Sequence, residues 1–139
     1  MNPFIYEICE YLETYGLNDN GGSRFVFDNA SNNNLYIGEL VRGVDGVYAK
    51  SVPSAEPDPY TAMQEMNIDF WSRRKNSLEA YEDMRIIYEL FHRHLEFDTS
   101  NYKVRFSRVL SQPIDLDRDG EGGKLLRISV KFTMTYLIS

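Results

Sequence analysis

Three alternating aspartates, Asp115, Asp117 and Asp119, precede a glycine with the spacing of the first half of a calcium-binding loop. Such a loop needs a bidentate glutamate at its twelfth position, where this chain has Leu126. The flanking residues also predict strands rather than the helices that frame a calcium loop of this kind. We therefore interpret residues 112–123 as a polar, turn-rich loop and not as an intrinsic calcium site.

The two histidines, His92 and His94, are the other candidates for metal chemistry. Two residues apart on a helix, their side chains diverge by about half a turn, so they cannot share one metal ion. Glu89 and His92 have the Glu-x-x-His spacing of di-metal bundles, which need that motif twice on four helices. Only two helices are predicted and Cys9 is the single cysteine, so no metal site is expected.

No arrangement in the sequence supplies a catalytic nucleophile. The chain has no Gly-x-Ser-x-Gly elbow, and nothing pairs Cys9 with a histidine. The run Gly21-Gly22-Ser23 lacks the lysine and the preceding strand of a phosphate-binding loop. The carboxylates are abundant but scattered. We expect neither an enzyme nor a bound cofactor.

The chain is organised around a strand that runs directly into a helix. In the strand, from Gln64 to Arg74, apolar side chains alternate with polar ones, which predicts one apolar and one polar face. Asn76 has the character of a helix cap, and Glu79 completes the spacing of a capping box. The predicted apolar stripe of the helix consists of Tyr81, Met84, Tyr88, Phe91 and Leu95.

The remaining elements complete an α+β domain. Pro3 and Gly16 bound a predicted amphipathic helix, with Cys9 as a small buried apolar residue. Asp45-Gly46 predicts a hairpin turn. Further strands are predicted at residues 24–28, 35–41, 47–52, 102–110 and 124–137. We expect one domain, residues 1–139, with an antiparallel or mixed sheet of about five strands and two main helices on one face.

The composition restricts the partners of this domain. Fifteen basic and 21 acidic residues give a net charge of −6, which disfavours general binding to nucleic acid. Arg73, Arg74 and Lys75 form the best local basic patch, which we interpret as a solvated corner. No apolar run of membrane-spanning length and no secretion signal are evident, and the single cysteine fits a reducing compartment.

The order of the elements carries several distinctive sequence segments. A helix leads to "NLYIGEL" and "GVYAKSVP", then to the proline-rich "SAEPDPY" and to "MNIDFWSRRKNSLEAYEDMRIIYELFH". From about Pro3 to Leu137 this order resembles the tail terminator proteins of long-tailed bacteriophages, which are also called minor capsid or tail-completion proteins. The most specific part of the resemblance is Ile68 to His92.

The resemblance implies an assembly function. Such proteins form a ring, usually a homohexamer, at the head-proximal end of the tail tube. The ring stops tube polymerisation and offers a surface to the connector of the head, while DNA passes through the lumen without being read. The resemblance therefore implies a virion protein, assembled in the bacterial cytoplasm, whose partners are its own copies, the tail tube protein and the head connector. It implies no membrane partner and no cofactor.

A closed ring needs one surface patch that meets a different patch on the neighbouring copy. We expect the first patch on the polar face of the central strand, at Asn67, Asp69, Trp71 and Arg73. For Trp71, a contact with a loop of its own chain is the other interpretation. Two loops offer further interface residues, which are Pro53, Pro57, Pro59 and Tyr60 in one and Asp115, Asp117, Asp119 and Glu121 in the other. We expect the second, acidic loop to face the lumen or the connector.

Other functions remain as alternatives at this point. A neck or head-completion protein would lie one layer nearer the capsid and would differ mainly in its binding partner. A small regulatory binding module should remain monomeric. An enzyme would require titratable groups that converge in a cleft.

Overall fold

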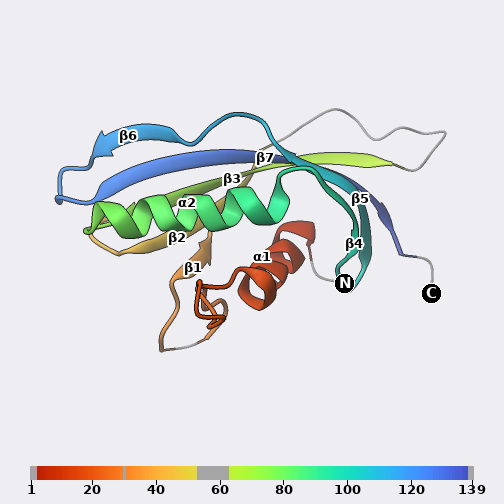
Figure 1. The fold of residues 1–139 in the computed structure, drawn as a ribbon, viewed down its shortest axis with the longest axis horizontal. Helices are drawn as coiled ribbons and strands as arrows, with labels where there is room; N and C mark the ends of the chain where they lie inside the picture. The colour runs from red at the N-terminus through yellow and green to blue at the C-terminus, as the bar shows by residue number, and fades with distance from the viewer. Residues whose placement is uncertain (1–2, 30, 53–62, 138–139) are drawn as a thin grey trace.

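The computed structural model describes residues 3–29, 31–52 and 63–137, and it places two helices on one face of a mixed sheet of seven strands (Figure 1). The predicted α+β class is confirmed. The elements in chain order are α1 (Phe4–Tyr15), β1 (Leu35–Ile37), β2 (Gly46–Val52), β3 (Gln64–Arg74), α2 (Ser77–Phe91), β4 (His94–Asp98), β5 (Tyr102–Val109), β6 (Ile114–Arg118) and β7 (Lys124–Tyr136).

The sheet is built around β7. Its strand order is β1-β2-β3-β7-β5-β4, and β6 pairs with the first residues of β7. Along one edge β7 pairs with the whole of β3, from Arg74 opposite Lys124 to Gln64 opposite Met134. Along its other edge it pairs first with β6 and then with β5. All pairs are antiparallel except β1 with β2.

Each helix has at least one end at a position where the sequence predicts a helix boundary. α1 starts directly after Pro3, whose carbonyl oxygen accepts hydrogen bonds from the first turn, and Gly16 follows its last residue. Asn76 caps α2, because its Oδ1 accepts a hydrogen bond from the backbone N–H of Leu78 at 2.9 Å. These local signals position the helices against the sheet.

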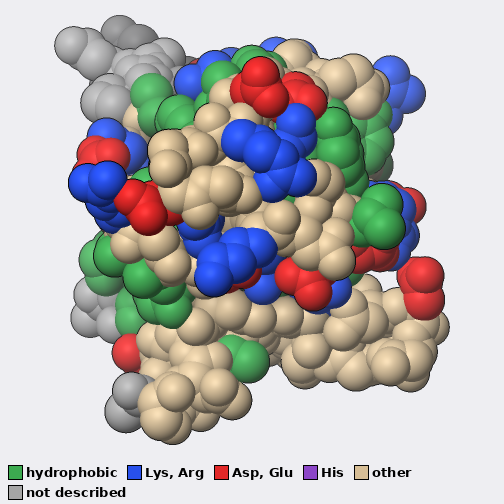
Figure 2. Space-filling view, turned by 90° about the vertical axis from the view of Figure 1, so that its left-hand side faces the viewer, with side chains coloured by type: hydrophobic (Ala, Val, Ile, Leu, Met, Phe, Trp, Pro, Cys, Tyr) green, Lys and Arg blue, Asp and Glu red, His purple; other side chains and the backbone are tan. Residues whose placement is uncertain are grey.

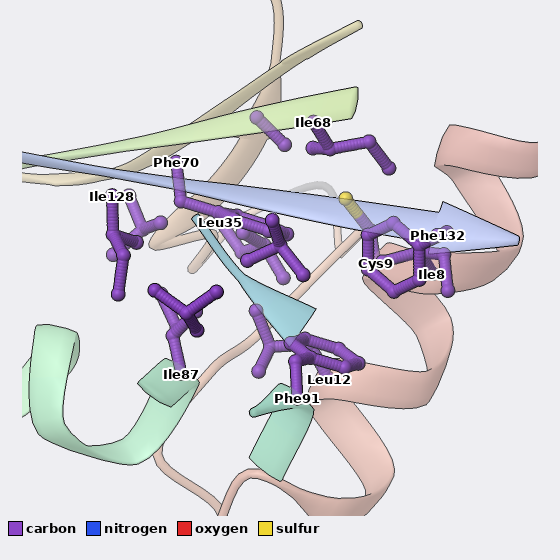
Figure 3. Packing of buried hydrophobic residues seen from close by; sticks show 14 of the residues in the cluster. Ile8, Cys9, Leu12, Leu35, Ile68, Phe70, Ile87, Phe91, Ile128 and Phe132 are labelled. Atoms are coloured by element: carbon purple, nitrogen blue, oxygen red, sulfur yellow. The ribbon is translucent and has the colours of Figure 1, made fainter. Parts of the chain in front are cut away.

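The core lies between the sheet and the two helices (Figure 3). α1 contributes Ile8, Cys9 and Leu12, which are fully buried. α2 contributes Ile87 and Phe91, which face the apolar side of β3 and β7. The strand predicted at residues 124–137 is confirmed as β7, in which buried and half-buried residues alternate from Leu126 to Met134, whereas Tyr136 is exposed.

The predicted helix stripe is confirmed at Met84, Tyr88 and Phe91 but was wrong at its two ends, and the predicted end of α2 was wrong as well. Tyr81 is 48% exposed, while Ala80 on the same turn is buried, so the buried stripe lies one position earlier at that end. α2 ends at Phe91, and Leu95 is an exposed residue of β4. The spacing of Leu95 fitted the helical stripe by coincidence, because Arg93 and Glu96 have positive φ values that no helix accommodates.

The predicted β-hairpin between residues 35–41 and 47–52 was also wrong. β1 is only three residues long and pairs in parallel with β2. The chain turns back through Gly38 and Gly43, both of which have positive φ. Gly46 lies close to β1, since a Cβ atom there would be 2.9 Å from the carbonyl oxygen of Asn34.

Three shorter segments differ from the sequence predictions. Residues 24–28 form an isolated bridge at Phe27 rather than a strand. β4 includes Leu95, which was expected on the helix, and β6 occupies part of the expected loop at residues 112–123. The predicted loop contacts of Pro53, Pro57, Pro59 and Tyr60 lie outside the described residues. Neither α1 nor α2, the helices of the described chain, has the length and apolar character of a bilayer span.

Candidate functional site

Three loops meet at one end of the sheet and bring Asp119 and Glu121, two of the four predicted interface residues of the acidic loop, beside Arg73. We call this region the loop end and define it by residues 38–45, 73–77 and 119–123. These segments connect β1 with β2, β3 with α2, and β6 with β7. The short connections fix the loops to the rigid strands β3 and β7, so the position of each loop follows from the register of the sheet.

Arg73 lies at the centre of the loop end, with a side chain that is only 2% exposed. Its guanidinium pairs with Asp45 of the β1–β2 loop and, from Nε to Oδ2 at 3.0 Å, with Asp119 of the β6–β7 loop. The Arg73 hydrogen bond is the main reason that the pKa of Asp119 is lowered. Arg73 therefore joins two loops of its own chain instead of reaching outward.

The β6–β7 turn is shaped around this guanidinium. Oδ1 of Asp119 accepts hydrogen bonds from the backbone N–H groups of Glu121 at 2.9 Å and Gly123 at 2.7 Å. A Cβ atom on Gly123 would lie 2.2 Å from Nε of Arg73, so glycine is required by the close approach. The turn and the arginine are thus fitted to each other.

Most carboxylates of the predicted acidic loop are neutralised within the chain. Asp115 pairs with Lys124 at 2.7 Å, and this hydrogen bond is the first cause of its lowered pKa. Glu121 pairs with Arg42 at 2.7 Å. Asp117, which has a φ of 64°, makes no ion pair with any described residue. Figure 2 views this end of the molecule and shows basic and acidic side chains interleaved across it.

A cleft of about 320 Å³ opens between the β1–β2 and β6–β7 loops. Leu40, Val41 and Leu125 provide its apolar lining, and the Arg42–Glu121 ion pair lies among its lining residues. The cleft contains no combination of nucleophile and base. Its chemistry suits an apolar side chain with a polar rim, as at a protein interface.

The face of the sheet away from the helices carries the other predicted patch. We call it the open face, because no other described element covers it (Figure 1). One row of paired residues crosses five strands there and consists of Tyr36, Tyr48, Trp71, Arg127 and Ile114. As predicted, the side chain of Trp71 lies on the face of β3 that is not apolar. The guanidinium carbon of Arg127 is 5.3 Å from the centre of its ring. Trp71 is half-buried in this row, while Tyr48 beside it is only 1% exposed and donates a hydrogen bond from its hydroxyl to the Val44 carbonyl oxygen of the β1–β2 loop.

Asn67 and Asp69 lie on the same open face, four and two residues before Trp71. Asp69 accepts a hydrogen bond from the Ser129 hydroxyl at 2.6 Å. Oδ1 of Asn67 is buried and has no hydrogen-bond partner. Of the four residues predicted on this strand, three therefore lie on the open face and Arg73 lies under the loops.

Sequence reasoning did not identify a second ion cluster on the helix side of the sheet. Asp83 of α2 is fully buried, and its carboxylate accepts hydrogen bonds from Arg24 at 2.9 Å and from Arg74 at 2.8 Å. The Ser72 hydroxyl donates to the same carboxylate at 2.8 Å. Ser72 and Arg74 lie on the same, helix-covered face of β3 as Phe70. Polar side chains on a face that a helix covers need a buried polar partner, and this was the signal in the sequence.

The described part of the chain holds no group of three or more side chains suited to bind a metal ion. No curated protein sequence matches the chain. The model of a family described as bacteriophage tail terminator protein matches residues 11–136. This match covers most of the chain, and the protein therefore belongs to the tail terminator family, whose members are structural, non-enzymatic proteins of the phage tail.

Proposed function

We propose that copies of this tail terminator protein form a closed ring, with six copies as the resemblance implies, at the head-proximal end of the tail tube. There the ring ends tube polymerisation and offers the head connector a binding surface. The family match over residues 11–136 is the observation that carries this proposal. It covers both α2 and the whole β3–β7 pair, on which the loop end and the open face are built.

The two surfaces of the monomer support an assembly role. A ring needs different patches that meet on neighbouring copies. The open face presents the half-buried Asn67, Asp69 and Trp71, and no other helix or strand of the described residues covers them. The loop end presents a cleft with an apolar lining at a different position on the subunit.

We propose that the β6–β7 loop faces the lumen or the head connector. Asp117 is the carboxylate available for such a role, because Asp115, Asp119 and Glu121 are paired with cations of their own chain. A neighbour at this surface would meet a weakly acidic, pre-organised turn. Asp117→Lys is therefore the informative reversal, while Asp119→Lys would also break the Arg73 cluster.

The experiment is capping of purified tail tubes from the same virus. The native mass of the protein is measured by light scattering, and the tubes are then imaged by electron microscopy with and without the protein. We expect ring-shaped density at one end of each tube and no further elongation when tube protein is added. Tubes that continue to grow at both ends in the presence of excess protein would overturn the proposal. If Asp117→Lys capped tubes and joined heads as the unaltered protein does, the role of the loop would be wrong.

A further inference from the structure

The open face contains basic groups that have no acidic partner in their own chain. Arg127 forms no ion pair with any described residue, and its buried Nε lacks a hydrogen-bond acceptor. Arg108 of β5 is exposed, also unpaired, and lies opposite Lys131 in the sheet. Oδ1 of Asn67 is a second buried atom without a partner on this face. Buried polar groups are normally hydrogen-bonded, so Arg127 and Asn67 have hydrogen-bonding capacity that the described chain does not use.

The outer surface of α1 has the opposite character. Glu10, Glu13 and Asp28 lie close together, and none of them pairs with a cation among the described residues. Burial and the neighbouring charges of Glu7 and Glu13 raise the pKa of Glu10. α1 packs on the helix-covered face of the sheet, so this acidic surface and the open face point in opposite directions (Figure 1).

We propose that a second copy of this chain covers the open face: the acidic surface of α1 in one subunit docks on Arg108 and Arg127 of the next. The inference rests on the proposed ring and specifies its subunit contact. Complementary charge argues for this occupant, because the unpaired acids Glu10, Glu13 and Asp28 lie on the opposite side of the monomer from the unpaired cations Arg108 and Arg127.

A contact between two different patches is heterologous, and its repetition around an axis forms a ring when the rotation returns to the first copy. A two-fold contact would instead place the open face against itself and bring Arg108 and Arg127 near their own copies. Like charges opposed in this way are repelled. The charge distribution therefore favours a ring with head-to-tail contacts over a symmetric dimer.

The test uses three single reversals of charge in the full chain. Arg108→Glu changes the open face, Glu10→Lys changes α1, and Arg93→Glu is the matched control, since Arg93 is exposed in the turn after α2 and makes no ion pair with any described residue. Self-association is measured by light scattering and by chemical cross-linking, in solution and on purified tail tubes, at low and at physiological salt. We expect each of the first two variants to associate at least about tenfold more weakly than the unaltered protein, and Arg93→Glu to behave like it.

The decisive sample is an equal mixture of Arg108→Glu and Glu10→Lys. In an alternating ring every contact again joins opposite charges, so the mixture should assemble although neither variant does so alone. Assembly of both single variants at the unaltered level, or failure of the mixture while both variants remain folded by circular dichroism, would overturn the inference. If the single variants still capped tail tubes in that case, the proposed function would stand although this subunit contact was wrong. If Arg108→Glu abolished binding to duplex DNA and left the oligomer unchanged, the open face would be a phosphate-binding surface and the inference would be wrong.

Discussion

Two neighbouring residues of β3, Arg73 and Arg74, point to opposite faces of the sheet and each belongs to an ion cluster. On the helix side, Arg74 and Arg24 share one carboxylate, Asp83, which is fully buried. On the other side, Asp45 and Asp119 share one guanidinium, that of Arg73, which is 2% exposed. The two clusters are therefore inverse arrangements, with a buried anion in one and a buried cation in the other.

The two clusters differ in the parts of the structure that they hold together. The Asp83 cluster joins α2 to the end of β3 and to the loop before β1, so it holds the helix layer on the sheet. The Arg73 cluster joins two loops whose carboxylates remain 35% and 22% exposed. Water can replace lost partners more easily at Asp45 and Asp119 than at Asp83. The first cluster should therefore control global stability, and the second should control the shape of the loop end.

Asp83→Asn is expected to have the largest effect. The substitution keeps the shape of the side chain but leaves Arg24 and Arg74 without their carboxylate. Removal of one member of a buried ion pair should lower the free energy of unfolding by about 3 kcal/mol. Urea unfolding measures this loss. Glu82→Gln, one position away, breaks only an exposed pair with Arg85 and should cost less than about 1 kcal/mol. Equal losses in the two variants would contradict the comparison.

Arg73→Met should have a smaller global effect and a larger local one. Methionine fills part of the buried space, while Asp45 and Asp119 gain contact with water. Loss of these charge-assisted hydrogen bonds should cost about 2 kcal/mol in urea unfolding. Amide hydrogen exchange should accelerate in both loops and not in α2. Faster exchange that extends through α2 would mean that the two clusters are not independent.

Gly123→Ala should reproduce part of the Arg73→Met effect without a change of charge. The added methyl group would lie 2.2 Å from Nε of Arg73, so the guanidinium must shift away from Asp119. We expect a loss of about 1–2 kcal/mol by thermal or urea unfolding, as for overpacking of a tight site. Gly120→Ala in the same turn meets no atom within 4 Å and serves as the control. A control variant as unstable as Gly123→Ala would show that the turn backbone, and not Arg73, is responsible.

Acidification should loosen β6 and the β6–β7 loop. The folded-state pKa values of Asp115 and Asp119 are lowered by Lys124 and Arg73. Their contribution to stability is therefore present above the ordinary aspartate pKa of about 3.9 and is lost as the pH falls through the lowered values. Hydrogen exchange of residues 114–123 as a function of pH measures this. Protection that stays constant down to the pH of global unfolding would refute it.

Regular local patterns predicted the elements that fold by alternation or capping. β3, β7 and the cap at Asn76 followed from neighbouring residues alone. The parallel pairing of β1 with β2 could not be predicted in this way, because Asp45-Gly46 has the composition of a hairpin turn and only Gly38 and Gly43 reveal that the chain turns earlier.

The candidate site was predictable only in part. The aspartates of the β6–β7 loop were identified, but their neutralisation was not, since the partners Arg42 and Arg73 come from distant segments of the sequence. Trp71 was placed on the correct face because a strand alternates strictly. Arg73 was assigned to the same face by the same rule, and no local pattern indicates that another loop buries it.

The central position of β7 has a consequence for the order of events during synthesis. β7 follows every other strand along the chain, yet it is the only strand that joins β3 to β5 and β6. The contact of Phe4 in α1 with Phe132 also cannot form before β7 has been synthesised. While the nascent chain lacks β7, the described strands fall into three groups that no strand pairing joins, which are β1-β2-β3, β5-β4 and β6. The sheet can therefore be completed only after the last strand has been synthesised.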